Sequence, residues 1–148
     1  MKIEIRTEPY QPWKELADYE RSGALEVGRF GACASFVGTM RDFNDGSDVS
    51  VMHLEHYHGM TEHQLTQLAE ETSRKFQLCD VFILHRVGCI YPGDPIVLVA
   101  AWSAHRAAAF DACREMMELL KSRATFWKKE TRPDGERWVE KNTPDSRS

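Results

Sequence analysis

The alternation of apolar and polar residues along the chain predicts several strands. These patterns cover residues 2–7, 30–38, 49–57, 80–87 and 95–102. The last two are apolar runs separated by a Tyr-Pro-Gly-Asp turn at 91–94, which favours antiparallel pairing between them.

Helical spacing of apolar residues follows in three other segments, at residues 13–21, 61–76 and 104–121. Pro12 precedes the first helix and Gly23 ends it. Thr61 and Gln64 match a capping box for the second helix, with Met60 placed as its hydrophobic staple.

The end of the chain predicts a hairpin at 124–140 around a Pro-Asp-Gly turn at 133–135, and Asn-Asp-Gly predicts a turn at 44–46. The order of elements indicates an α+β fold, in which two main helices pack on a largely antiparallel sheet. At 148 residues, the chain has the size of one domain. We therefore expect one unit over 1–148, with a frayed tail at 143–148.

Composition argues against several classes of protein. Hydrophobic residues make up 42% and charged residues 28%, as in a globular protein rather than a disordered one. No apolar run is long enough to span a membrane, and the N-terminal residues lack a signal-peptide pattern. The spacing of the four cysteines fits neither a disulfide framework nor a zinc site, and favours reduced thiols in the cytoplasm.

The net charge of −4 hides a local excess of basic residues. Between Lys121 and Arg137, six basic residues stand against three acidic ones. Nucleic-acid-binding proteins usually present a broad positive face, which this acidic chain does not match. The cluster is compatible with a pocket for one small anion, or with an ordinary solvated surface.

Two segments carry candidate anion-binding residues at the ends of elements. Ser103 is placed to cap a helix, where free backbone N–H groups attract anions, and His105 and Arg106 follow it. Arg41 ends a buried strand and enters a loop, a position that suits a bound ligand or a surface ion pair.

A third candidate segment carries two lysines. Lys128 follows two aromatic residues, which can desolvate an amine, lower its pKa and make it a proton donor or acceptor. Lys121 closes the preceding helix, where a cation is also favourable for the helix dipole alone.

Histidines and cysteines give weaker hypotheses. His56 and His58 share one face of the predicted strand and His53 faces the other way, so we expect no metal site from these three residues. A cysteine-dependent hydrolase, with Cys89 and His85 as its pair, remains an alternative.

The remaining cysteines give an expectation about packing. Cys33 and Cys113 stand in apolar patterns and are predicted to be core residues.

Several motifs stand in a distinctive order over residues 28–141: Phe-Val-Gly-Thr-Met-Arg at 36–41, Leu-Glu-His-Tyr at 54–57, His-Arg-Val-Gly at 85–88, Pro-Gly-Asp at 92–94, Ser-Ala-His-Arg at 103–106 and Lys-Ser-Arg-Ala-Thr-Phe-Trp-Lys-Lys-Glu at 121–130. In this order and spacing they closely resemble the catalytic (large) subunit family of molybdopterin synthase.

The resemblance implies an α/β-hammerhead fold with a small additional antiparallel subdomain. It also implies an activity in molybdenum cofactor biosynthesis, the conversion of cyclic pyranopterin monophosphate to molybdopterin. In the family, sulfur arrives as a thiocarboxylate on the C-terminal Gly-Gly of a small ubiquitin-like subunit. The implied assembly is a heterotetramer, a homodimer of large subunits with one small subunit at each end, and no metal or other cofactor is implied.

Matched residue by residue, the resemblance joins the three candidate segments into one site. Lys121 and Lys128 are the expected catalytic pair. The expected substrate-binding residues are Thr39, Met40, Arg41, His105, Arg106, Lys121, Lys128, Lys129 and Glu130. The chain departs from the family at Asn142, where some relatives carry a basic residue. A non-catalytic anion-binding or assembly module of the same fold is the alternative function.

Overall fold

The computed structural model describes residues 1–44, 47–48, 51–132 and 135–139 of the chain. Its helices are α1 (Pro12–Arg21), α2 (Met60–Phe76) and α3 (Arg106–Arg123). Its strands are β1 (Lys2–Arg6), β2 (Ala32–Thr39), β3 (Phe43–Asn44), β4 (Ser47–Asp48), β5 (Val51–His56), β6 (Asp80–Arg86), β7 (Gly88–Ile90), β8 (Pro95–Ser103), β9 (Phe126–Arg132) and β10 (Gly135–Val139). The predicted α+β class is confirmed.

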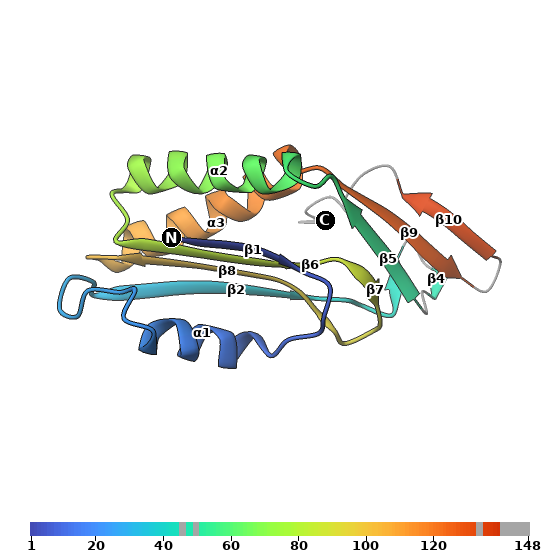
Figure 1. Ribbon diagram of the computed structural model, residues 1–148, viewed down its shortest axis with the longest axis horizontal. Helices are drawn as coiled ribbons and strands as arrows, with labels where there is room; N and C mark the ends of the chain where they lie inside the picture. The colour runs from blue at the N-terminus through green and yellow to red at the C-terminus, as the bar shows by residue number, and fades with distance from the viewer. Residues whose placement is uncertain (45–46, 49–50, 133–134, 140–148) are drawn as a thin grey trace.

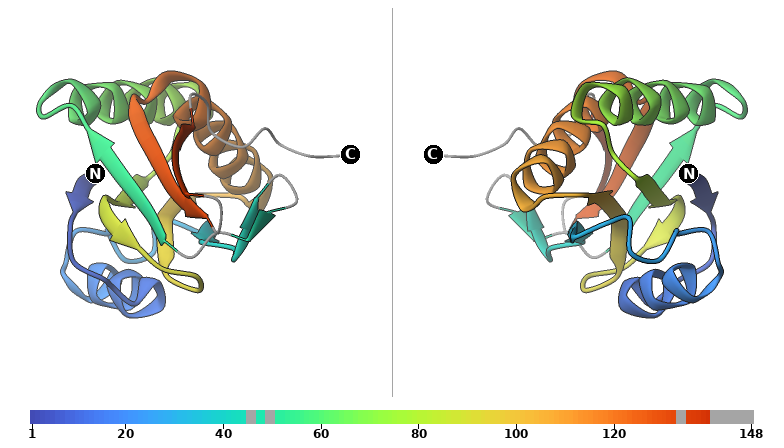
Figure 2. Two further views of the ribbon diagram at one scale, coloured as in Figure 1. Left: turned by 90° about the vertical axis from the view of Figure 1, so that its right-hand side faces the viewer. Right: turned by 90° about the vertical axis from the view of Figure 1, so that its left-hand side faces the viewer.

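The main sheet has the strand order β1-β6-β8-β2. β1 runs parallel to β6, and the other neighbours are antiparallel, as predicted for the two apolar runs. Helices α2 and α3 cover one face of this sheet and α1 covers the other (Figures 1 and 2). β6 and β8 read as almost continuous apolar runs because both of their faces are covered.

Two hydrophobic layers hold the main sheet between its helices. On the side of α2 and α3, fully buried residues such as Leu65, Val99 and Met116 pack together. On the side of α1, Phe82 and Trp102 form a second layer. Burial at about 25 cal/mol per Å² makes these layers the main source of stability.

The second sheet is antiparallel throughout, with the strand order β10-β9-β5-β7. Its inner face joins Met52, Leu54 and Ile90 to Met40 at the end of β2. It lies beyond one end of the main sheet (Figure 1), and matches the small antiparallel subdomain that the resemblance implied. Within the described part of the chain, no helix combines the length and apolar character needed to cross a membrane.

Three short strands, β3, β4 and β7, were not predicted. β3 and β4 pair on either side of residues 45–46, so the predicted turn has strands beside it, although the turn itself lies outside the described residues. The turn between β9 and β10 and the tail at 143–148 also lie outside the described residues, as does Asn142.

Helix α2 begins differently from the prediction. Its N-cap is Gly59, whose backbone N–H donates a hydrogen bond to Glu62 Oε1 at 3.0 Å. Thr61 and Gln64 do not cap the helix, because both bond to Thr125: the Thr61 hydroxyl donates to its carbonyl at 2.9 Å, and Gln64 Oε1 accepts its N–H at 2.9 Å. These two bonds hold the start of α2 against the connection between α3 and β9.

Candidate functional site

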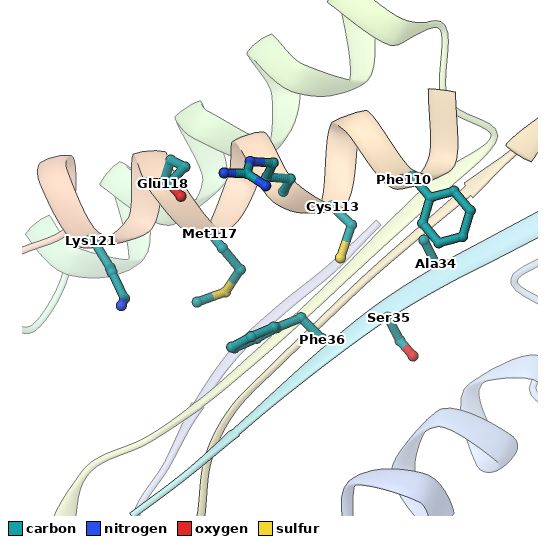
Figure 3. Close-up of a pocket in the computed structure, with 9 residues that line it drawn as sticks. Ala34, Ser35, Phe36, Phe110, Cys113, Met117, Glu118 and Lys121 are labelled. Carbon is teal, nitrogen blue, oxygen red and sulfur yellow. The ribbon is translucent and has the colours of Figure 1, made fainter. Parts of the chain in front are cut away.

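A cavity of about 400 Å³ lies between α3 and β2, the strand at one edge of the main sheet (Figure 3). Phe36 of β2 and Met117 and Lys121 of α3 point toward this space. Phe36 is 42% exposed and Phe110, at the other end of the cavity, is 67% exposed. The cavity therefore combines apolar side chains, open to solvent, with the charged groups of Arg114, Glu118 and Lys121.

The apolar lining was missed from the sequence. Met117 belongs to an apolar helical stripe and Phe36 to a strand of small residues, and both patterns are typical of an ordinary core. An exposed aromatic side chain on an edge strand is visible only once the sheet order is known.

Lys121 lies in the last turn of α3, where a lysine is favourable for the helix dipole. The helix ends at Arg123 and its C-cap is Ala124, whose N–H donates to the Leu120 carbonyl at 3.1 Å; β9 begins at Phe126. One continuous segment, tied to α2 at Thr125, therefore positions both Lys121 and Lys128.

The predicted run of site residues on β9 divides between the two faces of the second sheet, because side chains alternate along a strand. Lys128 pairs with Leu54 and Glu130 with Met52, which puts both on the inner face, where Glu130 is 2% exposed. Lys129 pairs with His53 on the outer face. Only Lys128 and Glu130 therefore share a face.

The two aromatic residues that precede Lys128, Phe126 and Trp127, also lie on opposite faces of the second sheet. The ring of Trp127 packs against Tyr57 on the outer face, with centroids 4.1 Å apart. Phe126 lies on the same face as Lys128 and stacks on His85 at 4.0 Å.

The three predicted site residues at the end of β2 differ in the exposure of their side chains. Thr39 and Arg41 are exposed, whereas the Met40 side chain is 6% exposed and belongs to the core beneath the second sheet. The Met40 N–H donates to the Asp94 carbonyl at 2.9 Å, and its own carbonyl accepts the Gly93 N–H at 2.8 Å. Met40 therefore fixes the strand end from which Arg41 leaves.

His105 and Arg106 lie at the opposite end of α3 from Lys121. The N-cap is His105 rather than Ser103, because Ser103 still belongs to β8, and its hydroxyl accepts the His105 N–H at 3.4 Å. At about 1.5 Å rise per residue, Arg106 and Lys121 are separated by roughly 22 Å along the helix axis. One chain therefore does not bring His105 and Arg106 to the two lysines.

The proposed pairing of Cys89 with His85 is wrong. Cys89 Sγ lies 3.5 Å from His53 Nδ1 instead. His85 is buried on β6 with its Nδ1 2.9 Å from the Arg86 carbonyl oxygen, and burial lowers the pKa of its imidazole to about 4. His85 is therefore a neutral core residue near pH 7.

The two predicted core cysteines have different environments. Cys113 is buried, and burial raises the pKa of its thiol to about 11, which makes it a poor nucleophile. Cys33 is exposed on the edge strand β2, so its predicted core placement is wrong.

Comparison with known proteins identifies the family. Residues 7–123 match the family described as MoaE protein. A molybdopterin synthase catalytic subunit from Pseudomonas aeruginosa is 49% identical over 140 residues, which cover 95% of this chain and 91% of the relative. The chain belongs to the MoaE family of molybdopterin synthase catalytic subunits. Membership makes it an enzyme of molybdenum cofactor biosynthesis, and confirms the resemblance found in the sequence.

Solved structures of the MoaE family share the fold. The molybdopterin biosynthesis MoaE protein from Burkholderia ambifaria has a TM-score of 0.79 and 44% identity, covering 98% of this chain and 92% of its own. Molybdopterin synthase from Staphylococcus aureus has a TM-score of 0.82 and 30% identity, covering 94% and 98% respectively. The α+β architecture described above is therefore the family architecture.

Proposed function

We propose that this enzyme transfers sulfur to cyclic pyranopterin monophosphate and so converts it to molybdopterin. The observation that carries the proposal is the cavity between α3 and β2, whose apolar walls meet Lys121 where α3 turns into the strand of Lys128. This placement supplies a ligand space lined by one amine, that of Lys121, and β9 continues from the same segment to Lys128, which suits the chemistry expected of the family.

The proposed sulfur donor is the thiocarboxylated C-terminal Gly-Gly of a small ubiquitin-like subunit. We assign the cavity beside Phe36 and Met117 to this tail, because Gly-Gly carries no side chains and the Lys121 ammonium would attract the thiocarboxylate anion at its end. Because the sulfur comes from the partner, the enzyme needs no thiol of its own. All four cysteines are free, which supports a reducing, cytoplasmic setting.

The two lysines are assigned the proton chemistry and charge stabilisation. Opening a cyclic phosphate and removing water from the pterin side chain both develop charge that a positioned cation stabilises and a proton donor relieves. Lys121 and Lys128 serve these steps, and the planar guanidinium of Arg41 suits the phosphate. Glu130, Thr39 and Met40 are assigned supporting roles around the substrate, Met40 through the position of its backbone, whereas Lys129 lies on the opposite face of β9 and is assigned none.

The two ends of α3 are too far apart for His105 and Arg106 to act beside Lys121 within one chain. His105 and Arg106 serve the substrate from a second copy of the chain, so that each copy in a homodimer completes the site of the other. Two-fold symmetric dimers exchange equivalent contacts in this way. With one small subunit at each site, the assembly is a heterotetramer.

The direct test mixes the enzyme with thiocarboxylated small subunit and cyclic pyranopterin monophosphate. We expect the dithiolene product, and none when the small subunit carries an ordinary carboxylate. Substrate binding without product would support the non-catalytic module instead. Full activity after alkylation of the exposed thiols would exclude the cysteine-dependent hydrolase.

A further inference from the structure

Three potential ligands converge where β5 turns into α2. One ligand atom each from His56, His58 and Glu62 lies within 4.8 Å of the other two. His56 Nε2 is 3.7 Å from Glu62 Oε2, and the two imidazole centroids are 4.6 Å apart. We call these three residues the β5–α2 corner.

We propose that the β5–α2 corner binds a divalent transition-metal ion such as Zn²⁺, through two imidazole nitrogens and one carboxylate oxygen. Zinc bonds of about 2.0–2.1 Å place tetrahedral ligand atoms roughly 3.3 Å apart. The separation of His56 and Glu62 is within a few tenths of an ångström of this value, and rotation of the exposed His58 ring closes the rest. A fourth position remains for water.

The corner is partly arranged before any ion binds. Gly59 has φ of 83°, in the left-handed region that favours glycine, and this lets the chain reverse between His58 and the helix. The Gly59 N–H holds Glu62 Oε1 at 3.0 Å, while Oε2 faces His56. The His56 side chain is only 10% exposed and is fixed by β5 opposite Phe126. Two of the three ligands are therefore held in place.

The donor set selects the class of ion. Calcium and magnesium prefer oxygen ligands throughout, whereas imidazole suits zinc, copper, nickel and cobalt. This proposal does not rest on the proposed sulfur transfer, and the ion is assigned no step in it.

A competing set of donors lies on the outer face of β5. Cys89 Sγ is 3.5 Å from His53 Nδ1, and His53 Nε2 is 3.2 Å from Glu55 Oε1. This set contains a thiol, so spectroscopy with cobalt separates it from the corner: a thiolate ligand adds an intense sulfur-to-metal charge-transfer band, and a nitrogen–oxygen site does not.

The test titrates metal-free protein with Co²⁺ and then Zn²⁺, followed by absorption spectroscopy and calorimetry. We expect one equivalent of cobalt to bind with visible bands of a four-coordinate ion and no charge-transfer band, and zinc to displace it. His58→Ala and Glu62→Gln should each weaken binding at least tenfold. His63→Ala, which removes another exposed imidazole of α2, should leave it unchanged, and so should Cys89→Ser.

Several outcomes would overturn the proposal. They are absence of saturable binding, undiminished binding by the His58→Ala variant, or a charge-transfer band that disappears with Cys89→Ser. Circular dichroism verifies that each variant is folded, and His58 is exposed, so its removal leaves the core intact.

Discussion

The two four-stranded sheets of this enzyme are built from different kinds of sequence. The central strands β6 and β8 of the main sheet lie between helices on both faces, and Ile83 and Val99 at their middle are fully buried. In the second sheet, the central strand β9 carries Lys128 and Glu130 on its inner face, and Lys129 on its outer face. Charged residues thus occupy positions that aliphatic residues fill in the main sheet.

This difference in sequence suggests that the main sheet provides stability and that the second sheet carries residues for chemistry. A strand buried on both faces tolerates few polar groups, because each would need a partner away from water. Among the residues that the structure describes, no helix closes the outer face of the second sheet, where Tyr57 and Trp127 remain 44% and 37% exposed. We therefore expect substitutions in the main sheet to change stability, and substitutions at the inner face of the second sheet to change activity.

The largest expected effect is on activity, from Lys121→Ala and Lys128→Ala. General acid–base roles contribute about 10²–10⁴-fold, so each variant should lose at least two orders of magnitude in product formation while remaining folded. Lys→Arg should not restore the full rate, because a guanidinium keeps its proton near neutral pH. Single-turnover measurement of the dithiolene product gives the rate.

Cys89→Ser is the control for the lysine variants and should keep a near-normal rate. If both lysine variants bind the small subunit, stay folded and form product at the parent rate, the assignment of the lysines is wrong.

The matching test of the main sheet is Ile83→Ala. Ile83 is fully buried within the layer against α2 and α3, so removing its side chain should lower the free energy of unfolding by about 2–5 kcal/mol. Urea denaturation measures the loss, while the rate per folded molecule should stay near that of the parent. A variant of unchanged stability would show that this layer does not dominate the fold.

A smaller effect is expected from Arg106→Ala, on substrate binding. Loss of a charge-assisted contact to phosphate costs about 1.5–3 kcal/mol, which weakens binding about tenfold or more. Calorimetry with the cyclic substrate measures this change, and unchanged affinity would remove Arg106 from the site.

Mixing variants tests whether two copies share each site. Well below substrate saturation, the weaker binding of Arg106→Ala removes most of its rate. Dimers that combine Arg106→Ala with Lys121→Ala contain one intact site if the residues come from different copies, so random mixing under these conditions should recover about one quarter of the activity. If both residues acted within one chain, the mixture would show only the residual rate of the Arg106→Ala protein. Light scattering that shows only monomers at micromolar concentration would also contradict the shared site.

The smallest effect concerns His85, which lies where the two sheets meet. Its pKa is lowered from 6.5 to about 4, mainly by burial and further by His56, while a hydrogen bond that the ring donates to the Arg86 carbonyl opposes the shift. Between these pH values the unfolded chain binds a proton that the folded chain does not. The free energy of unfolding should therefore fall as pH drops from 6.5 toward 4, by on the order of 1 kcal/mol per pH unit.

Urea denaturation at pH 7 and pH 5 measures this dependence. The His85→Leu variant lacks the imidazole, so its stability should fall less over the same interval. Equal pH dependence in both proteins would show that His85 titrates normally in the fold.

Local patterns in the sequence predicted the central strands β6 and β8 well, but the buried strand expected over residues 30–38 is the partly exposed edge strand β2. Burial of β6 and β8 on both faces requires uninterrupted apolar runs, and such runs are visible without knowing any neighbour. The helix start at Thr61 was misassigned because Thr61 and Gln64 bond to Thr125, which is distant in the chain. A capping pattern is local, and a contact between distant segments displaced it.

The candidate site was predictable as a set of residues but not as an arrangement. Alternation along β9 separates Lys129 from Lys128 once the strand is known, and the length of α3 separates Arg106 from Lys121. Strand periodicity places His56 and His58 on one face but does not include Glu62. The turn at the start of α2 brings Glu62 Oε2 to 3.7 Å from His56 Nε2, a contact that no strand periodicity contains.

In the second sheet, β9 lies between β5 and β10, so strands far apart in the sequence must pair. Lys128 of β9 pairs with Leu54 of β5, and closing so long a loop costs more conformational entropy than closing a short one. We therefore expect this pairing to form late in folding. During synthesis, the main sheet has all of its strands before β9 has been translated. A nascent chain can therefore complete its main sheet before Lys128 and the rest of β9 are available to the second sheet.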